Sequence, residues 1–335
     1  MMRNVTRLFS PRFVSLLFAF FAGAGALLPT DHGPIDHAMA APADPKSTGL
    51  VHGIHVQRTG DMPEARENAK MVVNAQQAQC GSALMKQACQ TTLSDPAASS
   101  RAKSRCVEMM SSFKLSGNLN SVGETVTDEY FAPTLNRSAR VVKTTVLRQT
   151  GVCSAEVEQK EQHVIAHHRP DGYTRYERKT DKQGRMQWVQ FEHRYIPGLA
   201  DMLKTSFDAA RLSGKVTVTA PLGHKTLVPG RACEMRRVGA GAVEFVSCIH
   251  ATGIKFPSHV TFESEVVASG KTERVEKFVS YADNVALSRD LFFPKRGEKV
   301  MTGKDTRSDP NNPMSRWCAA EKARTGKDPC KGGDE

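Results

Sequence analysis

The sequence lacks the short motifs that identify most catalytic and metal sites. Its 335 residues contain no C-x-x-C, no H-E-x-x-H, no G-x-S-x-G and no glycine-rich phosphate loop. These absences remove the usual signatures of thiol oxidoreductases, zinc proteases, serine hydrolases and nucleotide-binding enzymes. S-x-x-K occurs at 100–103 and 111–114, but without the S-D-N and K-T-G elements of penicillin-binding proteins. We expect no enzyme and no cofactor; a hydrolase whose catalytic residues follow no known motif is the alternative.

Aromatic residues are also scarce, at 7% of the chain. The formal net charge is +11, but the lysines and arginines are dispersed, and the dense run at 137–148 is interrupted by Val, Thr and Leu. Nucleic-acid binding usually combines a continuous basic patch with aromatic stacking platforms. We therefore expect no nucleic-acid partner. We expect instead a solvated basic surface, with an anionic surface of the cell envelope as the alternative partner.

Long hydrophobic runs are missing as well. The N-terminal apolar run at 13–28 has 16 residues, whereas a membrane-spanning helix needs about 20. Three arginines precede it and small residues follow, which is the pattern of a secretory signal peptide. We expect residues 1–40 to be removed after Ala40, with cleavage after Ala24 or Ala26 as alternatives. The protein would then be periplasmic or secreted and keep no transmembrane segment; an uncleaved anchor is the minority interpretation.

Eight cysteines follow the signal peptide, and none precedes position 80. An even number of cysteines in an exported chain predicts disulfides, whereas the same residues in the cytosol would suggest a metal or catalytic site. Pairing neighbours first, and the remaining two by elimination, gives four expected bridges: Cys233–Cys248, Cys318–Cys330, Cys89–Cys106 and Cys80–Cys153.

Composition divides the remaining chain into four parts. Residues 41–60 have no periodicity and are expected to form a linker. Residues 61–114 are expected to form a helical hairpin with arms at about 63–93 and 97–113 and a kink near Gly81. Short β-branched and aromatic runs between turn residues predict an antiparallel β domain at 115–296, with one packed helix at 197–210. A polar tail closed by a disulfide follows at 297–335. The expected fold class is α+β: a curved antiparallel sheet, or open half-barrel, covers a helix and follows a disulfide-linked helical hairpin.

One hairpin can be predicted in more detail. If Cys233 faces Cys248 across two antiparallel strands, Arg237 lies opposite Glu244, a favourable charge pair. A four-residue loop at 239–242 would bring the two cysteines to the closer cross-strand spacing, and a two-residue loop at 240–241 is the alternative. We expect this bridge to be structural; a redox switch is the other interpretation.

Histidines are the only candidates for a metal site. His163 and His167 would lie one turn apart and could share an ion if their segment were a helix, but about 13 Å apart if it were a strand. We expect a strand and no metal.

The C-terminal half resembles a known family of periplasmic proteins. The segments TLVPGRACEMRR, EFVSCIHATGIKFPSHVTFESEV and KTERVEKFVSYADNVALSRDLFFPKRG resemble the end of proteins of the lipoprotein-localisation-factor type and related envelope families of unknown function. The resemblance covers about residues 190–296. It implies an unclosed, curved antiparallel sheet wrapped around a helix and an apolar cavity. The cysteine bridge, the helical N-terminal segment and the polar tail depart from that family.

The resemblance also implies an apolar groove between the concave sheet and the expected helix. We therefore expect a non-enzymatic binding or carrier-like protein for an apolar ligand, such as a lipid, an acyl chain or a lipoprotein. The alternative is a structural or interaction protein of the cell envelope, with the sheet filled by its own core and an envelope protein as the partner. The candidate ligand-binding residues are Phe191, Tyr195, Leu199, Leu203, Phe207, Phe245, Phe262 and Phe278.

Overall fold

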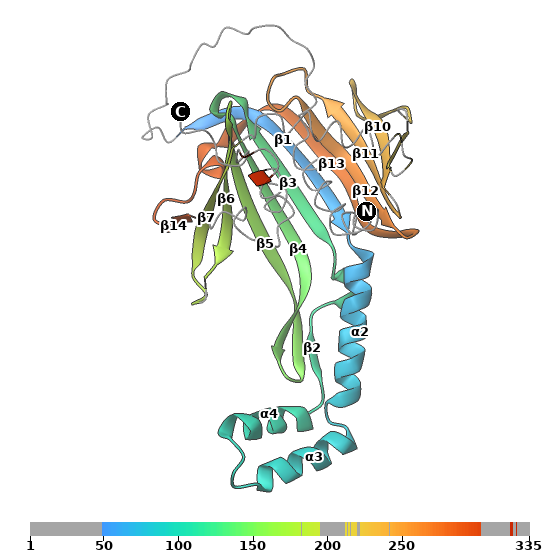
Figure 1. Cartoon of the computed structure of the whole chain (residues 1–335), viewed down its shortest axis with the longest axis vertical. Coiled ribbons are helices and arrows are strands. Elements are labelled where there is room, and N and C mark those ends of the chain that lie inside the picture. Colours follow the sequence, from blue (N-terminus) through green and yellow to red (C-terminus); the bar gives the residue numbers. More distant parts are fainter. Residues whose placement is uncertain are drawn as a thin grey trace.

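A computed structural model of the chain describes residues 49–181, 183–194, 212, 214, 216–219, 222–240, 242–302, 322–323 and 326. The expected signal peptide, the expected helix at 197–210 and the expected Cys318–Cys330 bridge lie outside these residues. The described part is a sheet-rich body from which a narrow stalk projects (Figure 1). The class is broadly α+β, as expected.

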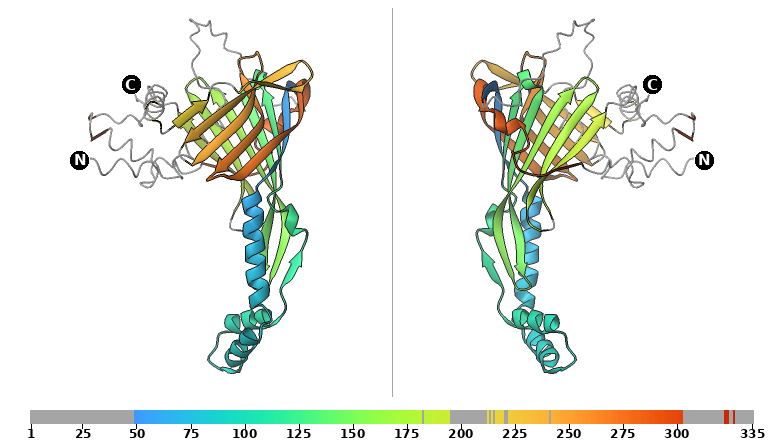
Figure 2. Two further views of the ribbon diagram at one scale, coloured as in Figure 1. Left: turned by 90° about the vertical axis from the view of Figure 1, so that its right-hand side faces the viewer. Right: turned by 90° about the vertical axis from the view of Figure 1, so that its left-hand side faces the viewer.

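The body is one curved sheet in the order β14-β7-β6-β5-β4-β3-β1-β13-β12-β11-β10-β8. Neighbours are antiparallel, except that β14 runs parallel to β7; off this path, β2 runs parallel to β5 and β9 pairs with β10. β1 lies at the back of the curve, and β7 and β10 lie toward its open side (Figure 2). The strands are β1 (Leu50–Asp61), β2 (Lys114–Ser116), β3 (Thr125–Ala132), β4 (Arg137–Gly151), β5 (Ser154–Arg169), β6 (Gly172–Thr180), β7 (Met186–Arg194), β8 (Val216–Thr219), β9 (His224–Val228), β10 (Arg231–Ala240), β11 (Val243–Ala251), β12 (His259–Ala268), β13 (Lys271–Ser288) and β14 (Val300–Thr302).

The expected linker at 41–60 is wrong for residues 50–60, which belong to the first strand, and residues 41–48 lie outside the described part of the structure. β1 is a central strand that pairs with β3 and β13, and its side chains Ile54 and Val56 are buried. Glycine at position 53 is required by packing, because a Cβ there would lie 2.1 Å from the carbonyl oxygen of Phe131. The alternation of apolar and polar residues expected of a half-buried strand is present, but Gly53, Gly60 and the polar side chains of the strand concealed it.

The two-helix hairpin expected at 61–114 is a stalk of three helices in the structure. The helices are α2 (Pro63–Gln79), α3 (Ala83–Ser94) and α4 (Ser100–Met110). The first expected arm is divided at Gly81, where a kink was expected, and the φ of +71° there favours glycine. The hydroxyl of Ser82 then accepts a hydrogen bond from the Met85 amide and begins α3. α2 runs beside β4 and β5, while α3 and α4 form a foot at the end of the stalk (Figures 1 and 2).

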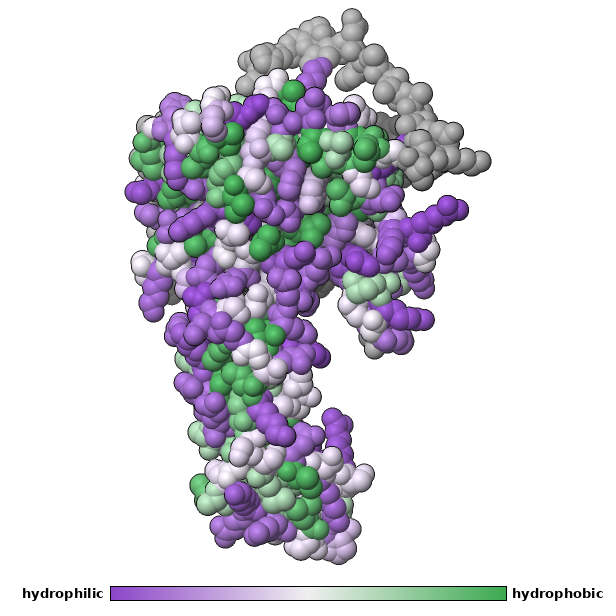
Figure 3. Space-filling model, turned by 180° about the vertical axis from the view of Figure 1, so that it is seen from behind, coloured by the Kyte–Doolittle hydropathy of each residue, from purple (hydrophilic) through white to green (hydrophobic). Residues whose placement is uncertain are grey.

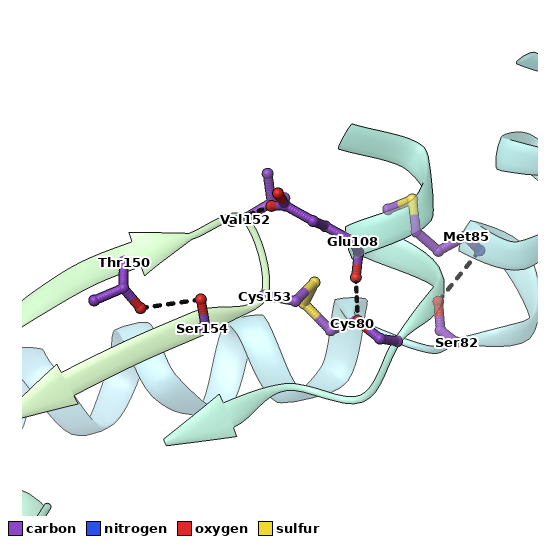
Figure 4. Close-up of a disulfide and its surroundings, with 9 residues drawn as sticks. Cys80, Ser82, Met85, Glu108, Thr150, Val152, Cys153 and Ser154 are labelled. Atoms are coloured by element: carbon purple, nitrogen blue, oxygen red, sulfur yellow. Dashed lines mark hydrogen bonds between the residues drawn. A yellow bond between two sulfur atoms is a disulfide. The ribbon is translucent and has the colours of Figure 1, made fainter. Parts of the chain in front are cut away.

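Two disulfides hold the stalk together. Cys89 and Cys106 join α3 to α4 with a Cα–Cα distance of 5.0 Å, and Cys80 and Cys153 join the end of α2 to the β4–β5 turn with a distance of 5.8 Å. Glu108 of α4 also accepts a hydrogen bond of 3.0 Å from the amide of Val152 in that turn (Figure 4). Both cysteine pairs are those expected from the sequence.

The third disulfide joins Cys233 to Cys248, as expected, but the strand register differs. Met235, not Cys233, is the partner of Cys248, and Glu244 lies opposite Gly239, so the predicted Arg237–Glu244 pair is wrong. Ala240 pairs with Val243, which leaves a two-residue loop. The observed register differs from the predicted one by two residues, so each side chain keeps its predicted face. The bridge is therefore diagonal, with a Cα–Cα distance of 5.3 Å.

The sheet has a separate hydrophobic cluster on each face. One contains Val56 of β1 together with Cys233 of β10. It lies on the concave face, opposite the face that the short helix η3 (Arg289–Phe292) covers from outside the curve (Figure 2). The other contains Ala139, Ile165 and Trp188, and is covered by Phe292 of η3. Figure 3 shows the molecule from behind, where apolar side chains form small separate patches among polar ones.

Candidate ligand-binding face

Half of the predicted ligand-binding residues lie in the described part of the structure. Phe191, Phe245, Phe262 and Phe278 are on β7, β11, β12 and β13. Six strands separate β7 from β12 in the sheet, so Phe191 lies far along the curve from the other three. The predicted residues Tyr195, Leu199, Leu203 and Phe207 lie outside the described residues.

Phe262 and Phe278 belong to the concave hydrophobic cluster. Their ring centroids are 5.0 Å apart, and Phe262 is fully buried. The ring of His250 stacks on Phe262 at 5.1 Å, and Tyr281 packs edge-on at 5.4 Å. In this part of the face the aromatic side chains pack on one another and on the Cys233–Cys248 bridge.

The other two predicted residues lie outside this cluster. Phe245 is half-buried and lies opposite Val266. Phe191 is half-buried on β7, where the ammonium group of Lys179 lies 5.2 Å from its ring centroid. That distance is within the range of a cation–π contact.

An ionic cluster crosses the middle of the concave face. Its centre is Arg58 of β1, whose side chain is 3% exposed and lies on the same side of β1 as the buried Val56. The guanidinium contacts Glu129 of β3 at 2.8 Å and Glu276 of β13 at 3.4 Å. Burial alone would lower the pKa of Arg58, but the two carboxylates raise it above its ordinary value.

Glu276 is the most heavily used acceptor of the cluster. Its carboxylate pairs with Arg58 and Arg274, and it accepts hydrogen bonds from Ser264 at 3.1 Å and Thr127 at 3.4 Å. Burial would raise the pKa of Glu276, but Arg58, Arg274 and Arg140 together hold it below its ordinary value. This carboxylate is therefore charged at neutral pH and its acceptor capacity is filled.

Arg140 of β4 completes the cluster on its more open side. Its side chain is 39% exposed, and its nitrogens lie 3.4 Å from Glu129 and 3.6 Å from Glu276. Burial lowers the pKa of Arg140, and the neighbouring charges of Arg58 and Arg274 lower it further. The two carboxylates raise it, but the net shift is downward. An arginine remains charged under all ordinary conditions, so the cluster of Arg58, Arg140, Arg274, Glu129 and Glu276 has more cations than anions.

A second group of charges continues along the same face. Arg140 lies opposite Val164, which in turn lies opposite Glu177 of β6, and directly paired residues point to the same side of a sheet. Glu177 pairs with Arg175 at 2.6 Å and Lys179 at 2.5 Å. Cations again outnumber anions, and the excess positive charge reaches Phe191.

His163 and His167, the histidines considered as metal ligands, are on β5, which is the strand arrangement expected from the sequence. His163 packs edge-on against Trp188 at 5.1 Å, and burial lowers its pKa. His168 instead contacts Phe256 at 4.6 Å. In the described part of the chain, no group of three or more His, Cys, Asp or Glu side chains is placed to hold a metal ion.

The stalk contains a cleft of about 340 Å³ between α2 and β4. Its walls are mainly apolar and include Ala69 and Val72 of α2 and Val146 of β4. The cleft could not be predicted from the sequence, because it depends on how the long β4–β5 ribbon lies against the helix. It lies in the stalk, whereas the predicted ligand-binding residues of the described chain are on β7, β11, β12 and β13.

No helix among the described residues is long and apolar enough to cross a membrane. No protein-family model matches the chain, and no curated protein matches it.

The ionic cluster was not predicted from the sequence. Arg58 lay in the expected linker, and Glu276 is 218 residues away, so nothing local connects them. The available signal was an arginine two positions after a buried valine on a strand, because a charged residue at an inward position needs a partner.

Proposed function

We propose that the protein is an exported, non-enzymatic binding or carrier-like protein that holds an apolar ligand, such as a lipid, an acyl chain or a lipoprotein, on the concave face of its sheet. The observation that carries the proposal is the curved, open sheet with half-buried apolar side chains, Val142, Val164 and Phe191, on its inner face. Concave apolar surfaces with a few placed polar groups are typical of small-molecule sites.

Export to the periplasm or the cell exterior is part of this proposal. Three pairs of cysteines lie at disulfide distance, which fits a protein that folds in an oxidising compartment. The N-terminal pattern of arginines followed by a short apolar run supports the same route.

Extraction of lipids from the natively purified protein, followed by mass spectrometry, tests the proposal. We expect the wild-type protein to carry an apolar ligand in near-stoichiometric amount. Phe191→Ala should reduce that amount with the fold retained. Val279→Ala, which changes an exposed apolar residue outside the predicted contact set, should not. Wild-type protein that carries no lipid and acquires none from vesicles would contradict a carrier function.

A structural or interaction role is the second candidate, and exposed apolar side chains on the stalk favour it. Leu84 of α3 is 81% exposed and Val107 of α4 is 58% exposed. Exposed apolar side chains mark a partner site where they form a continuous patch. Photo-crosslinking in cells tests this role: under it, a crosslinker at position 84 captures one defined envelope protein, and one at Lys271 on the body does not. Equal capture at both positions would contradict a stalk-specific partner.

A further inference from the structure

Two arginines of the concave ionic cluster, Arg140 and Arg274, combine an accessible side chain with a buried Nε that has no hydrogen-bond partner among the described residues. Arg274 nevertheless donates a close hydrogen bond to Glu276 through a terminal nitrogen, whereas Arg140 makes only longer contacts. Its Nε is buried and makes no hydrogen bond with any residue that the structure describes. The contacts to Glu129 and Glu276, at 3.4 and 3.6 Å, are those of neighbouring charges and are longer than usual charge-assisted hydrogen bonds. With 39% of the side chain exposed, part of Arg140 can be reached by a ligand.

The carboxylates of the cluster have little capacity left for Arg140. Glu276 is shared among Arg58, Arg274, Ser264 and Thr127. The closest Glu129 oxygen to Arg140 is Oε1, which Arg58 already contacts at 2.8 Å. Three guanidinium groups therefore share two carboxylates, and one positive charge is not balanced within the cluster.

The surroundings of Arg140 combine this unbalanced charge with apolar surface. Val164 lies directly opposite Arg140 on β5, and Val142 follows two residues later on the same side of β4. Both valines are half-buried. A cation beside an apolar strip is complementary to a molecule with an anionic head and an apolar body.

We propose that Arg140 binds the anionic head, a carboxylate or a phosphate, of an amphipathic ligand whose apolar part lies along the concave face. This inference rests on the proposed function and specifies its ligand class. Arg274, which is 38% exposed on the far side of Glu276, is the second cation available to the same head. A planar guanidinium suits both anions because it can donate two parallel hydrogen bonds.

The test compares probes that differ only in the head. Oleate, oleoyl lysophosphatidic acid and the neutral oleyl alcohol are titrated by calorimetry into the full protein after lipid removal. Variants are Arg140→Gln, Arg140→Lys and, as a matched control, Arg148→Gln. Arg148 is on the same strand, but its side chain is 53% exposed and pairs with Glu156 and Glu158. Circular dichroism and thermal melting establish that each variant is folded.

We expect wild-type protein to prefer at least one anionic probe over oleyl alcohol by about tenfold or more, the loss typical of removing a charged hydrogen bond. Arg140→Gln should abolish that preference and leave oleyl alcohol binding unchanged, whereas Arg140→Lys should keep part of it and Arg148→Gln all of it. Preference for oleate or for the lysophospholipid identifies the head as carboxylate or phosphate.

Two results overturn the inference separately from the proposed function. Equal binding of all three probes by the wild-type protein would show that the anionic head is not recognised, while binding at the apolar site is retained. A preference for the anionic probes that persists in Arg140→Gln would show that another residue binds the head. If Arg140→Gln does not fold, an undiminished preference in Arg140→Lys, with unchanged salt dependence, would show the same. Wild-type protein that binds none of the probes contradicts the proposed function itself.

Discussion

At the scale of single residues, the concave face depends on a charge that could not be buried alone. Arg58 is almost completely enclosed, and burying an isolated ion costs far more than any one contact returns. Glu129 and Glu276 reduce that cost because they lie on the two strands that pair with β1. The cluster therefore also fixes which strands can be neighbours, because another arrangement would leave Arg58 without a partner.

Removal of the Glu276 charge should destabilise the body. Glu276→Gln keeps the shape of the side chain but leaves Arg58 and Arg274 sharing fewer anions, and we expect a loss of about 3 kcal/mol in the free energy of unfolding. Chemical denaturation measures it. Glu263→Gln is the control on β12, because its partner Lys225 is 48% exposed and such pairs contribute little. Equal effects of the two changes would show that the cluster does not stabilise the sheet.

The pKa of Glu276 also predicts how stability depends on pH. A carboxylate whose pKa is lowered on folding stabilises the folded state fully above its ordinary value of about 4.3. This contribution is lost as the pH falls through the lowered value in the folded state. The free energy of unfolding should thus decrease below about pH 4.3, and less steeply for Glu276→Gln than for the wild-type protein. Parallel curves for the two proteins would contradict this assignment.

At the scale of elements, much of the β domain could be predicted, because each strand has its own periodicity and turn residues. β1 could not, since its glycines are explained only by the close approach of β3 and β13. The 233–248 hairpin was predicted on the correct faces but two residues out of register. Local cross-strand pairing favoured Arg237 with Glu244, whereas the structure pairs Val238 with Phe245 and leaves a two-residue turn.

The candidate site could likewise be predicted only in part. Aromatic residues such as Phe262 and Phe278 could be assigned to the sheet from their strands, but a sequence does not reveal which of them face one another. The ionic cluster joins β1, β3, β4 and β13, and such contacts depend on the order of strands in the sheet. That order is not a local property of any strand.

Two disulfides allow the stalk and the body to be destabilised separately. Cys80 and Cys153 are 73 residues apart and Cys233 and Cys248 are 15 apart, so loop entropy predicts contributions of about 4 and 3 kcal/mol. In hydrogen exchange, Cys80→Ser with Cys153→Ser should reduce amide protection in α2, α3 and α4 and leave β11 and β12 unchanged. Cys233→Ser with Cys248→Ser should do the reverse. Uniform loss of protection in either variant would show that stalk and body unfold as one unit.

At the scale of the whole molecule, the stalk and the curved sheet present two different surfaces. The stalk carries the apolar cleft against α2 and the exposed Leu84 and Val107. The sheet carries cations and half-buried apolar side chains on its inner face. We therefore propose that a ligand binds on the sheet and, under the second candidate function, that a partner contacts the stalk.

Photo-crosslinking of a diazirine-labelled fatty acid to the purified protein, with the labelled peptides located by mass spectrometry, determines which of these surfaces binds the ligand. We predict labels on the inward residues of β4, β5 and β7, around Val142, Val164 and Phe191, with competition by unlabelled oleate. Labels confined to the stalk cleft beside Val72, or to the outer cluster around Trp188, would contradict ligand binding on the concave face.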